Sequence, residues 1–487
     1  MFVSSLYGQE TYVLVRFLLR RGIGVTYLVA FLVAANQFRP LVGEDGLLPI
    51  EGYVERRRFR DAPGIFYLFP DNAVIGAAAW LGVGLSILAV SGASEAFGTG
   101  VSMLVWGTLW LLYLSFVNAG QTFYGFGWES MLLETGFLAV FLGASDVATP
   151  TVVVWLFRWL LFRNMFGAGL IKIRGDECWR NLTCMDYHYE TQPMPNPTSW
   201  YAHHLPDSVH RGAVVVNHVV ELAIPFLFFA PQPVAAFAGL ATILFQGWLM
   251  VTGNFSWLNF LTAVLAFSTF SDALLAPVLP ITSWNTATAP LPFQIAVWLL
   301  AAVVVLLSVR PVRNMLSSGQ VMNTSFDSLH LVNTYGAFGS ITRNRYEIAV
   351  EGTHDDVLTD DTEWKAYEFK GKPTDPERRP PQVAPYHLRL DWQLWFAAMA
   401  PSPFRHPWFV RLLGKLLEGD ESTLSLLRTN PFPDDPPKHV RAVRYRYRFT
   451  SPEERAETGR WWHRDRVGTY FDPVSIDDAR MRESLRR

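Results

Sequence analysis

Charged residues are scarce in this sequence, and their scarcity excludes a chain that lies wholly in water. Only 17% of the 487 residues are Asp, Glu, Lys or Arg, whereas an ordinary soluble domain carries about 25%. Residues 96–128 contain no Asp, Glu, Lys, Arg or His, and the only charge in residues 222–309 is Asp272. From Arg310 onward, by contrast, the chain holds 52 of its 84 charged residues. Two solvents are implied, a bilayer for the first part of the chain and water for the last.

Cysteine is nearly absent, and the two residues present, Cys178 and Cys184, are too few for a scaffold of disulfides. They fit either one local bridge or a pair of free thiols. The net charge is −2, and no basic stripe with interleaved aromatic residues occurs in a loop, so we expect no nucleic-acid partner.

Standard catalytic motifs are also missing. The sequence has no GxSxG elbow, no P-loop, no HExxH and no GxGxxG after a strand, which weakens the hydrolase, ATPase and dehydrogenase interpretations. We predict no catalytic residue and no cofactor, and these absences favour a protein that is not an enzyme.

The long apolar segments predict a mainly α-helical protein, a polytopic transmembrane bundle over residues 1–310. A helix needs about 20 mainly apolar residues to span the hydrocarbon core, and backbone groups in lipid must be satisfied within the helix. About nine spans are predicted, at residues 14–36, 73–92, 98–118, 129–145, 151–173, 212–230, 234–252, 255–271 and 291–309. Arg16, Arg20 and Arg21 interrupt the first span, whose opening turns alternatively lie in the membrane interface. No cleavable signal peptide is expected.

The remaining residues, 311–487, predict a water-facing α+β domain. Tyr346, Ile348 and Val350 alternate with polar residues, and residues 443–449 do the same, a period that is typical of strands with one packed and one wet face. Residues 392–399, 409–417 and 422–428 are predicted to be short helices. The proline-rich residues 373–385 predict an extended loop.

Basic residues cluster in three connections, at 39–60, at 172–211 and from Arg310 onward. With nine alternating spans these connections fall on one face of the membrane, whereas the opposite connections carry no Lys or Arg. The positive-inside rule taken alone places the charged face in the cytoplasm. Two of the connections exceed thirty residues, and long loops count less in that rule.

The large polar loop at 174–211 and the ionisable residues beside it form the candidate functional site. Ionisable groups within a membrane cost at least a few kcal/mol each, so they normally face the bundle interior, pair, and mark functional paths. The candidate residues are Arg163, Lys172, Arg174, Asp176, Trp179, His188, Tyr189, Glu190, Asn196, Trp200, His203, His204, His218 and Glu221. Glu129 and Glu134 are plausible partners for the basic ones. The alternative is an ion-pair lattice that only holds helices together.

The histidines of this region raise the question of a metal site. His218 and Glu221 share a helix face at i and i+3, a spacing that suits a metal half-site or a proton relay. No second such pair occurs, and zinc needs three or four ligands of suitable geometry. A hydrogen-bonded structural histidine is favoured, and no metal is predicted.

Many short motifs carry a family resemblance. They are GAGLIK (167–172), RGD (174–176), CW (178–179), TC (183–184), YHYETQP (187–193), PNP (195–197), SWY (199–201), HHLP (203–206), NH (217–218), Glu221, VTGN (251–254), NRYE (344–347), EFK (368–370), Pro376, RRPP (378–381), APY (384–386), RLDW (389–392) and NPFP (430–433). With these motifs the chain resembles the lipase maturation factor family from about residue 120 onward. That family is distantly similar to the membrane domain of vitamin K-dependent carboxylases, from which no catalytic residue is carried over.

The resemblance implies a membrane-bound, chaperone-like factor that assists the assembly of secreted lipases or other exported clients. Its partners would be the lipid bilayer and a client protein such as a lipase. A multi-pass protein of the endoplasmic reticulum membrane is expected in a eukaryote, and of the plasma membrane in a prokaryote. The alternative is a membrane enzyme or a small-molecule transporter that uses the buried polar cluster around Lys172, His218 and Glu221.

The resemblance also bears on orientation, because it places the charged face on the lumenal side, against the arginine count. Long loops can translocate regardless of charge, and we therefore expect the extracytoplasmic side. A Cys178–Cys184 bridge and glycosylation at Asn181, in Asn181-Leu-Thr183, would follow from that orientation.

Overall fold

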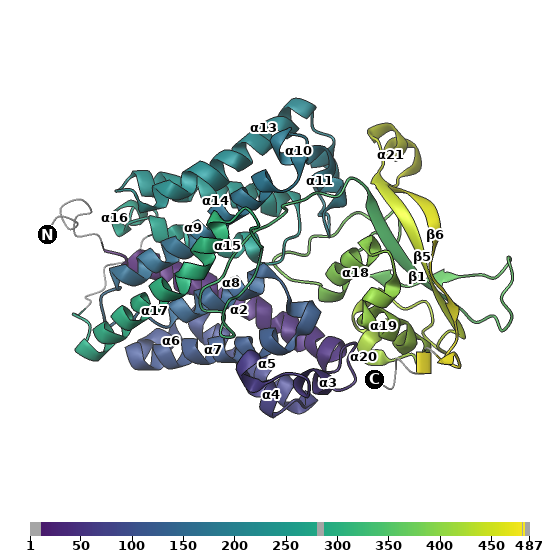
Figure 1. The fold of residues 1–487 in the computed structure, drawn as a ribbon, viewed down its shortest axis with the longest axis horizontal. Coiled ribbons are helices and arrows are strands. Elements are labelled where there is room, and N and C mark those ends of the chain that lie inside the picture. The colour runs from purple at the N-terminus through teal and green to yellow at the C-terminus, as the bar shows by residue number, and fades with distance from the viewer. Residues whose placement is uncertain (1–10, 280–286, 480, 483–487) are drawn as a thin grey trace.

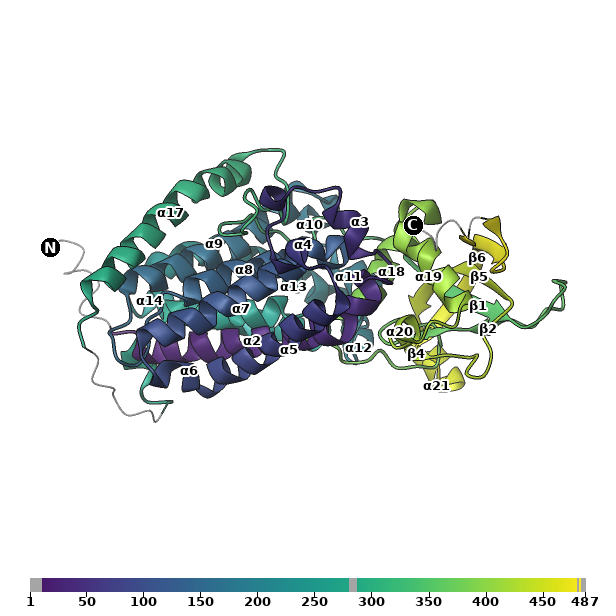
Figure 2. The ribbon, with the colours of Figure 1, turned by 90° about the horizontal axis from the view of Figure 1, so that it is seen from below.

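The computed structural model describes residues 11–279, 287–479 and 481–482. Helices make up an elongated bundle, and a smaller part that contains the strands lies at one end of it (Figure 2). The main helices of the bundle are α2 (Val13–Val42), α5 (Asn72–Ser91), α7 (Thr99–Ala119), α8 (Gly127–Ala139), α9 (Thr151–Arg174), α13 (Asp207–His218), α14 (Val234–Thr252), α15 (Leu258–Ala266) and α17 (Leu291–Leu316). Each of the nine predicted segments therefore contains a helix.

Among the described residues, six helices are long and apolar enough to cross a membrane: Val13–Val42, Asn72–Ser91, Thr99–Ala119, Asp207–Phe229, Val234–Thr252 and Leu291–Leu316. These helices show a multi-pass membrane protein. The count of nine is not confirmed. Helices α8 and α15 have 13 and nine residues, shorter than the hydrocarbon core requires. Helix α9 has 24 residues but carries four basic side chains along its length.

Two of the arginines of the first helix, Arg16 and Arg20, are buried rather than interfacial. Helix α2 is continuous over 30 residues, and Arg16 and Arg20 lie inside the bundle. The Arg16 guanidinium donates to the carbonyl of Val147 at 2.7 Å, and Arg20 donates to the Ser102 hydroxyl at 2.7 Å. These bonds replace part of the water that would surround the buried charges, and the burial of Arg16 shows that the helix enters the bundle from its first turns.

Helix α13 does not end cleanly but continues through a π-helical turn at Val219–Ala223 and a 3₁₀ turn at Ile224–Phe229. Pro225 explains the irregularity, because it lacks the N–H that would bond to the carbonyl of Glu221. Such π turns occur frequently at functional sites, and Glu221 lies within this one.

Short helices mark the two ends of the bundle. Helices α3 (Ile50–Val54), α10 (Glu177–Arg180), α11 (Met185–Thr191) and α12 (Ser199–His203) lie at the end that meets the C-terminal part, whereas α6 (Ala93–Ala96) and α16 (Asp272–Leu275) lie at the opposite end (Figures 1 and 2). The basic connections therefore share one end of the bundle, as the distribution of arginine predicts.

The C-terminal part contains an antiparallel four-stranded sheet in the order β2-β1-β5-β6 and a two-stranded sheet of β3 and β4. The strands are β1 (Arg345–Thr353), β2 (Lys365–Ala366), β3 (Glu368–Phe369), β4 (Leu427–Thr429), β5 (His439–Phe449) and β6 (Trp462–Val474), and the helices are α18 (Arg389–Met399), α19 (Pro407–Leu417), α20 (Glu421–Leu424) and α21 (Pro452–Thr458). Strands β1 to β3 come first, helices α18 to α20 follow, and the remaining strands come after them, so strands and helices occur in separate runs, as in an α+β arrangement.

Two local predictions in this part were wrong. Residues 422–428 form one helical turn followed by strand β4 rather than a helix throughout. Strand β1 does not have a wet face, because its polar residues are buried as well as its apolar ones. Glu347 is ion-paired with Arg345 and with Lys372, and mutual neutralisation allows these charged groups to leave water.

Candidate functional site

The polar residues at the end of α9 converge on the irregular turn that follows α13. The Lys172 ammonium donates to a Glu221 carboxylate oxygen at 2.6 Å and to the Asn217 amide oxygen at 2.8 Å. The Asn217 amide nitrogen in turn donates to the second oxygen of Glu221 at 3.1 Å. All three side chains are buried. The triad is therefore closed and electrically neutral.

Arg163 lies on the same helix α9 as Lys172, nearer the middle of the helix, and belongs to a different cluster. It is ion-paired with Glu134 of α8 and donates to the carbonyl of Asn333 at 2.7 Å. Glu134 also accepts hydrogen bonds from the Asn333 backbone N–H and the Tyr335 hydroxyl. The segment after α17 thus folds back against α8 and α9, and the sequence prediction that Glu134 pairs with a basic residue is consistent with this contact.

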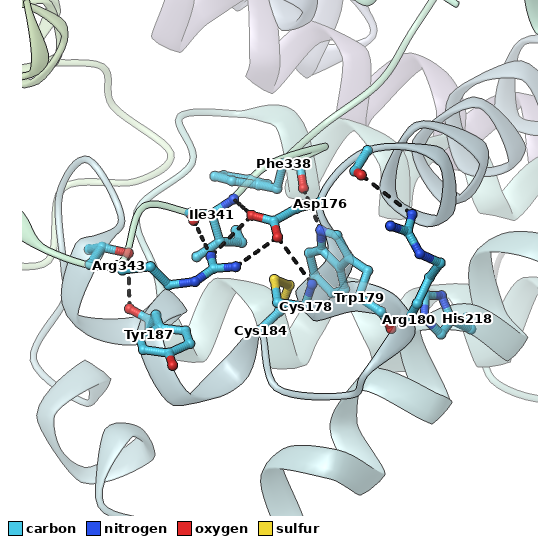
Figure 3. Close-up of a disulfide and its surroundings, with 12 residues drawn as sticks. Asp176, Cys178, Trp179, Arg180, Cys184, Tyr187, His218, Phe338, Ile341 and Arg343 are labelled. Atoms are coloured by element: carbon cyan, nitrogen blue, oxygen red, sulfur yellow. Dashed lines mark hydrogen bonds and ion pairs between the residues drawn. A yellow bond between two sulfur atoms is a disulfide. The ribbon is translucent and has the colours of Figure 1, made fainter. Parts of the chain in front are cut away.

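Asp176 connects the start of the polar loop to the segment that precedes β1 (Figure 3). Its carboxylate accepts two bonds from the Arg343 guanidinium, at 2.7 and 3.0 Å. It also caps α10 by accepting from the Cys178 N–H and accepts from the Ile341 N–H. The hydrogen bonds from Arg343, followed by those from the backbone, lower the pKa of Asp176 to about 2.

The disulfide lies directly beside this carboxylate. Cys178 and Cys184 are bonded, and the bridge closes the turn between α10 and α11 (Figure 3). Trp179, next in the chain, donates from its indole nitrogen to the carbonyl of Phe338 at 2.8 Å. His218 makes its hydrogen bond to the carbonyl of Trp179 at 2.9 Å through Nε2. Since a carbonyl can only accept, Nε2 carries the proton, and His218 is oriented toward the loop rather than toward Glu221.

Arg174 does not join the triad either. Its guanidinium donates to the carbonyls of Met315 and Ser317 and to the Gln320 amide oxygen. These acceptors lie at and beyond the C-terminal end of α17, where helix carbonyls have no partner in the helix itself. Arg174 therefore holds the end of the last long helix against α9.

The second half of the polar loop is attached to the sheet. Glu190 accepts from the Phe449 N–H at 2.7 Å, and Trp200 donates from its indole nitrogen to the carbonyl of Thr450 at 2.9 Å. Arg345, fully buried, donates to the carbonyls of Glu190 and Gln192. His203 lies 3.8 Å from Glu190, and burial lowers its pKa to about 4. The loop and the C-terminal part consequently share one set of hydrogen bonds.

Asn196, His204 and Tyr189 also belong to the predicted set, and each has a local structural role. Asn196 donates to the carbonyl of Val251 at 2.6 Å, and His204 bonds through Nδ1 to the carbonyl of Trp200 at 2.7 Å. Tyr189 is buried, and its ring lies 5.8 Å from that of His210. The Asn196 bond holds the loop against the C-terminal end of α14, and the other two contacts lie within the loop and the start of α13.

Two family models match this chain. The lipase maturation factor transmembrane domain covers residues 14–277, and the lipase maturation factor C-terminal domain covers residues 331–472. Together they include the sheet and the bundle described above except for helix α17. The chain belongs to the lipase maturation factor family.

Curated relatives within the lipase maturation factor family match along almost the whole chain. The chain is 44% identical to lipase maturation factor 1 of Homo sapiens, with 96% of this chain and 89% of the relative covered. It is 42% identical to lipase maturation factor 1 of Mus musculus, covering 96% and 88%. Identity to lipase maturation factor 2 of Homo sapiens is 30%, covering 97% and 84%. No solved structure matches the chain.

Two residues that join the parts of this chain were not among the predicted site residues. Arg389 of α18 donates to Glu129 of α8 at 2.8 Å, and Asn254, after α14, bonds four backbone groups. Both lie in motifs that the resemblance rests on, RLDW and VTGN. Their partners are far away in sequence, so no local pattern could have identified them.

A cavity of about 690 Å³ opens beside the triad of this family member. Helices α9, α11, α13, α14 and α15 contribute to its walls, and Lys172, Trp179, His188 and Glu221 are among the lining residues. His188 makes ring contacts with Phe255 and Phe338. Burial and, less, the charge of Lys172 lower the pKa of His188 to about 3, so the ring is neutral at physiological pH.

Among the described residues, no group of three or more His, Cys, Asp or Glu is placed to hold a metal ion. His218 and Glu221 in particular have separate partners, as given above. Arg163 pairs with Glu134, and Arg174 holds the end of α17. Most of the other predicted candidates fall into three sets: the Lys172–Glu221 triad beside the cavity, the Asp176 and disulfide region, and the half of the loop bound to the sheet.

Proposed function

We propose that this chain is a membrane-bound, chaperone-like maturation factor that assists the assembly of secreted lipases or other exported clients. The observation that carries this proposal is the 44% identity to human lipase maturation factor 1 over 96% of this chain and 89% of that protein. A match of that extent includes both the bundle and the C-terminal part, and it leaves only about a tenth of the relative outside the match.

The arrangement of the polar loop supports a binding role at the end of the bundle. Arg345, Glu190 and Trp200 join the loop to the sheet, and Asp176 joins it to the segment before β1. A surface that is already ordered loses little conformational entropy when a partner binds. The loop and the C-terminal part together are the surface that we propose for the client.

The side of the membrane is part of the proposal. Disulfides persist in oxidising compartments, and the bridge between Cys178 and Cys184 supports a lumenal or extracytoplasmic position for this end. In a eukaryote the membrane would be that of the endoplasmic reticulum. Asn181, which is exposed, provides a test in eukaryotic cells: glycosidase treatment should shift the mass of the wild-type chain and leave Asn181→Gln unchanged. A cytoplasmic end would give no glycosidase shift for either chain.

The function itself is tested by complementation. Cells that lack their own maturation factor would receive this chain together with a secreted dimeric lipase, and both the activity and the mass of secreted lipase would be measured. We expect activity per lipase molecule to rise with wild-type chain and to fall with Arg345→Ala, which frees the polar loop from the sheet.

The control for this experiment is Arg446→Ala, at an exposed position of the neighbouring strand β5, which should retain wild-type activity. Chain levels and melting temperatures are measured for both variants. Unchanged lipase activity with and without the wild-type chain would argue that lipases are not its clients.

A second candidate function is a membrane enzyme or small-molecule transporter that uses the buried polar cluster. The cavity of about 690 Å³ beside Lys172 and Glu221 favours it, because ligand sites commonly have volumes of about 300–1,000 Å³. Identification of small molecules that co-purify with the detergent-solubilised chain distinguishes this candidate from a factor that binds proteins alone.

A further inference from the structure

The lining of the cavity beside the triad is apolar at the mouth and contains polar side chains deeper in. Val216 of α13 and Leu244 and Trp248 of α14 are among its lining residues and are 53%, 66% and 42% exposed. They belong to two helices that are apolar enough to span a membrane. The mouth of the cavity between these helices therefore faces the hydrocarbon of the bilayer, and an acyl chain can enter it without crossing water.

The deeper lining contains polar side chains with unused hydrogen-bonding groups. Asn259 of α15 is 4% exposed, and its side chain has no hydrogen-bond partner in the described part of the chain. Gln246 of α14 is equally buried and donates only to the Met165 sulfur, at 3.5 Å, a weak acceptor. Buried amides are normally paired, because an unmade bond costs about 1–3 kcal/mol. These two amides are available to a ligand.

The charge of the lining decides what kind of ligand headgroup fits. Among the described residues that line the cavity, Lys172 and Glu221 are the only acidic or basic side chains besides His188, and they form an ion pair at 2.6 Å. His188 is neutral for the reason given above. A phosphate headgroup would bring a negative charge into a low-dielectric site without a free cation, at a cost of several kcal/mol. Hydroxyl and ester carbonyl groups, by contrast, match amide donors and acceptors.

We propose that this cavity binds a lipid with acyl chains and an uncharged, hydrogen-bonding headgroup, of the diacylglycerol class, which enters from the bilayer between α13 and α14. The acyl chains lie against the apolar residues of the mouth, and the headgroup reaches Asn259 and Gln246. This inference is independent of the proposed lipase client, because it uses only the cavity and its lining.

The test uses the full-length chain in phosphatidylcholine nanodiscs. A diacylglycerol that carries a diazirine in one acyl chain is crosslinked by light, and the adducts are located by peptide mass spectrometry. Phosphatidic acid with the same labelled acyl chain is the comparison. We expect diacylglycerol adducts within α13, α14 and α15, and much weaker labelling of those helices by phosphatidic acid.

Gly212→Trp should close the mouth of the cavity. Gly212 lines the cavity and has no atom within 4 Å of the position where a Cβ would lie, so a large side chain occupies the opening without displacing the fold. The matched control is Gly107→Trp on α7, where the surroundings are equally open and the position lies outside the cavity lining. The first variant should lose the cavity adducts, and the control should keep them.

Asn259→Leu tests the headgroup contact while leaving the shape of the side chain nearly unchanged. Its affinity for diacylglycerol should fall about fivefold, as expected for one lost hydrogen bond. Its affinity for the acetylated analogue without a free hydroxyl should change less, an outcome that a purely structural role of Asn259 would not produce. Adducts confined to outward faces such as that of α17, equal labelling by phosphatidic acid, or cavity adducts that survive Gly212→Trp would each overturn the proposal.

Discussion

Arg389 and Glu129 form an ion pair at 2.8 Å in which neither side chain is exposed to solvent. Glu129 lies in the first turn of helix α8 of the bundle, and Arg389 begins helix α18 of the C-terminal part. Arg389 also donates to the carbonyl of Phe123 at 2.7 Å, and its guanidinium lies 3.4 Å from the centre of the Tyr124 ring. The two parts of the chain are therefore joined by a buried charge pair rather than by a flexible connection alone.

Arg389→Ala should destabilise the protein by about 3–5 kcal/mol, because removal of one partner leaves the other charge buried and unpaired. Thermal unfolding in detergent measures the loss. Adding Glu129→Gln to Arg389→Ala should recover part of it, since the uncompensated carboxylate is then gone.

Lys438→Ala is the control for this pair. Lys438 pairs with Asp356 on the surface, where both side chains are more than half exposed, and exposed pairs contribute only about 0–1 kcal/mol. A loss for Arg389→Ala as small as that for Lys438→Ala would contradict a structural role for the buried pair.

The stability of the C-terminal part should depend on pH through Asp391. Burial raises the pKa of this carboxyl from 3.8 to about 6. The folded state therefore binds a proton that the unfolded state has released, and the contribution of Asp391 to stability falls as pH rises from about 4 to 6. Above pH 6, Asp391→Asn should be more stable than wild type by up to about 3 kcal/mol, the equivalent of roughly two pKa units.

Melting temperatures of the two proteins between pH 4 and 7 check this prediction. The difference should shrink toward pH 4, where the wild-type carboxyl is protonated. Asp434→Asn, at an exposed position, is the control, and its difference from wild type should stay the same throughout. A constant difference for Asp391→Asn would exclude the predicted linkage.

Loss of the disulfide should loosen the first half of the polar loop. Replacing Cys178 and Cys184 together by Ser removes the cross-link of a short loop, with an expected cost of about 2 kcal/mol from the larger entropy of the unfolded chain. Hydrogen exchange of residues 176–191 should increase. Wild-type protein treated with a reductant should show the same increase, and the double variant should not respond to the reductant.

Substitutions of Asn254 should lower the free energy of unfolding more than the small size of its side chain suggests. Its amide nitrogen donates to the carbonyls of Pro195 and Pro381, and its oxygen accepts from the N–H groups of Val383 and Ala384. Asn254→Leu removes both functions, and Asn254→Asp removes only the donors. We expect losses in unfolding free energy of about 1 kcal/mol or more per bond removed, and so a larger loss for Leu than for Asp in thermal unfolding. Equal losses would indicate that the donors alone matter.

The sequence predicted the helices better than their relation to the membrane. All nine apolar segments contain helices, because a run of apolar residues in lipid has no other way to satisfy its backbone. The number of membrane spans could not be predicted from the apolar segments, because α8 and α15 are short and α9 carries paired charges. Whether a helix crosses the membrane depends on neighbours that cover its polar groups, and those neighbours come from distant parts of the sequence.

The candidate site was predicted in part. The residues of the polar loop were identified from their cost in a membrane, and Lys172 was placed in one cluster with Glu221. Of the two acidic partners predicted for the basic candidates, Glu134 pairs with one of them, whereas Glu129 pairs with Arg389 instead. Lys172 meets Glu221 across 49 positions, whereas Asp176 meets Arg343 across 167 and Glu129 meets Arg389 across 260. Contacts of this length leave no periodic signal in a single sequence.

The order of apolar and charged residues by itself determined that this protein has a helical membrane part followed by a water-facing part with strands, because each solvent accepts only certain side chains. The tertiary structure alone decided which charges neutralise one another, which amides remain unpaired, and where a cavity remains between the helices. Those features depend on the packing of side chains from distant segments, and packing is settled only when the whole chain has folded.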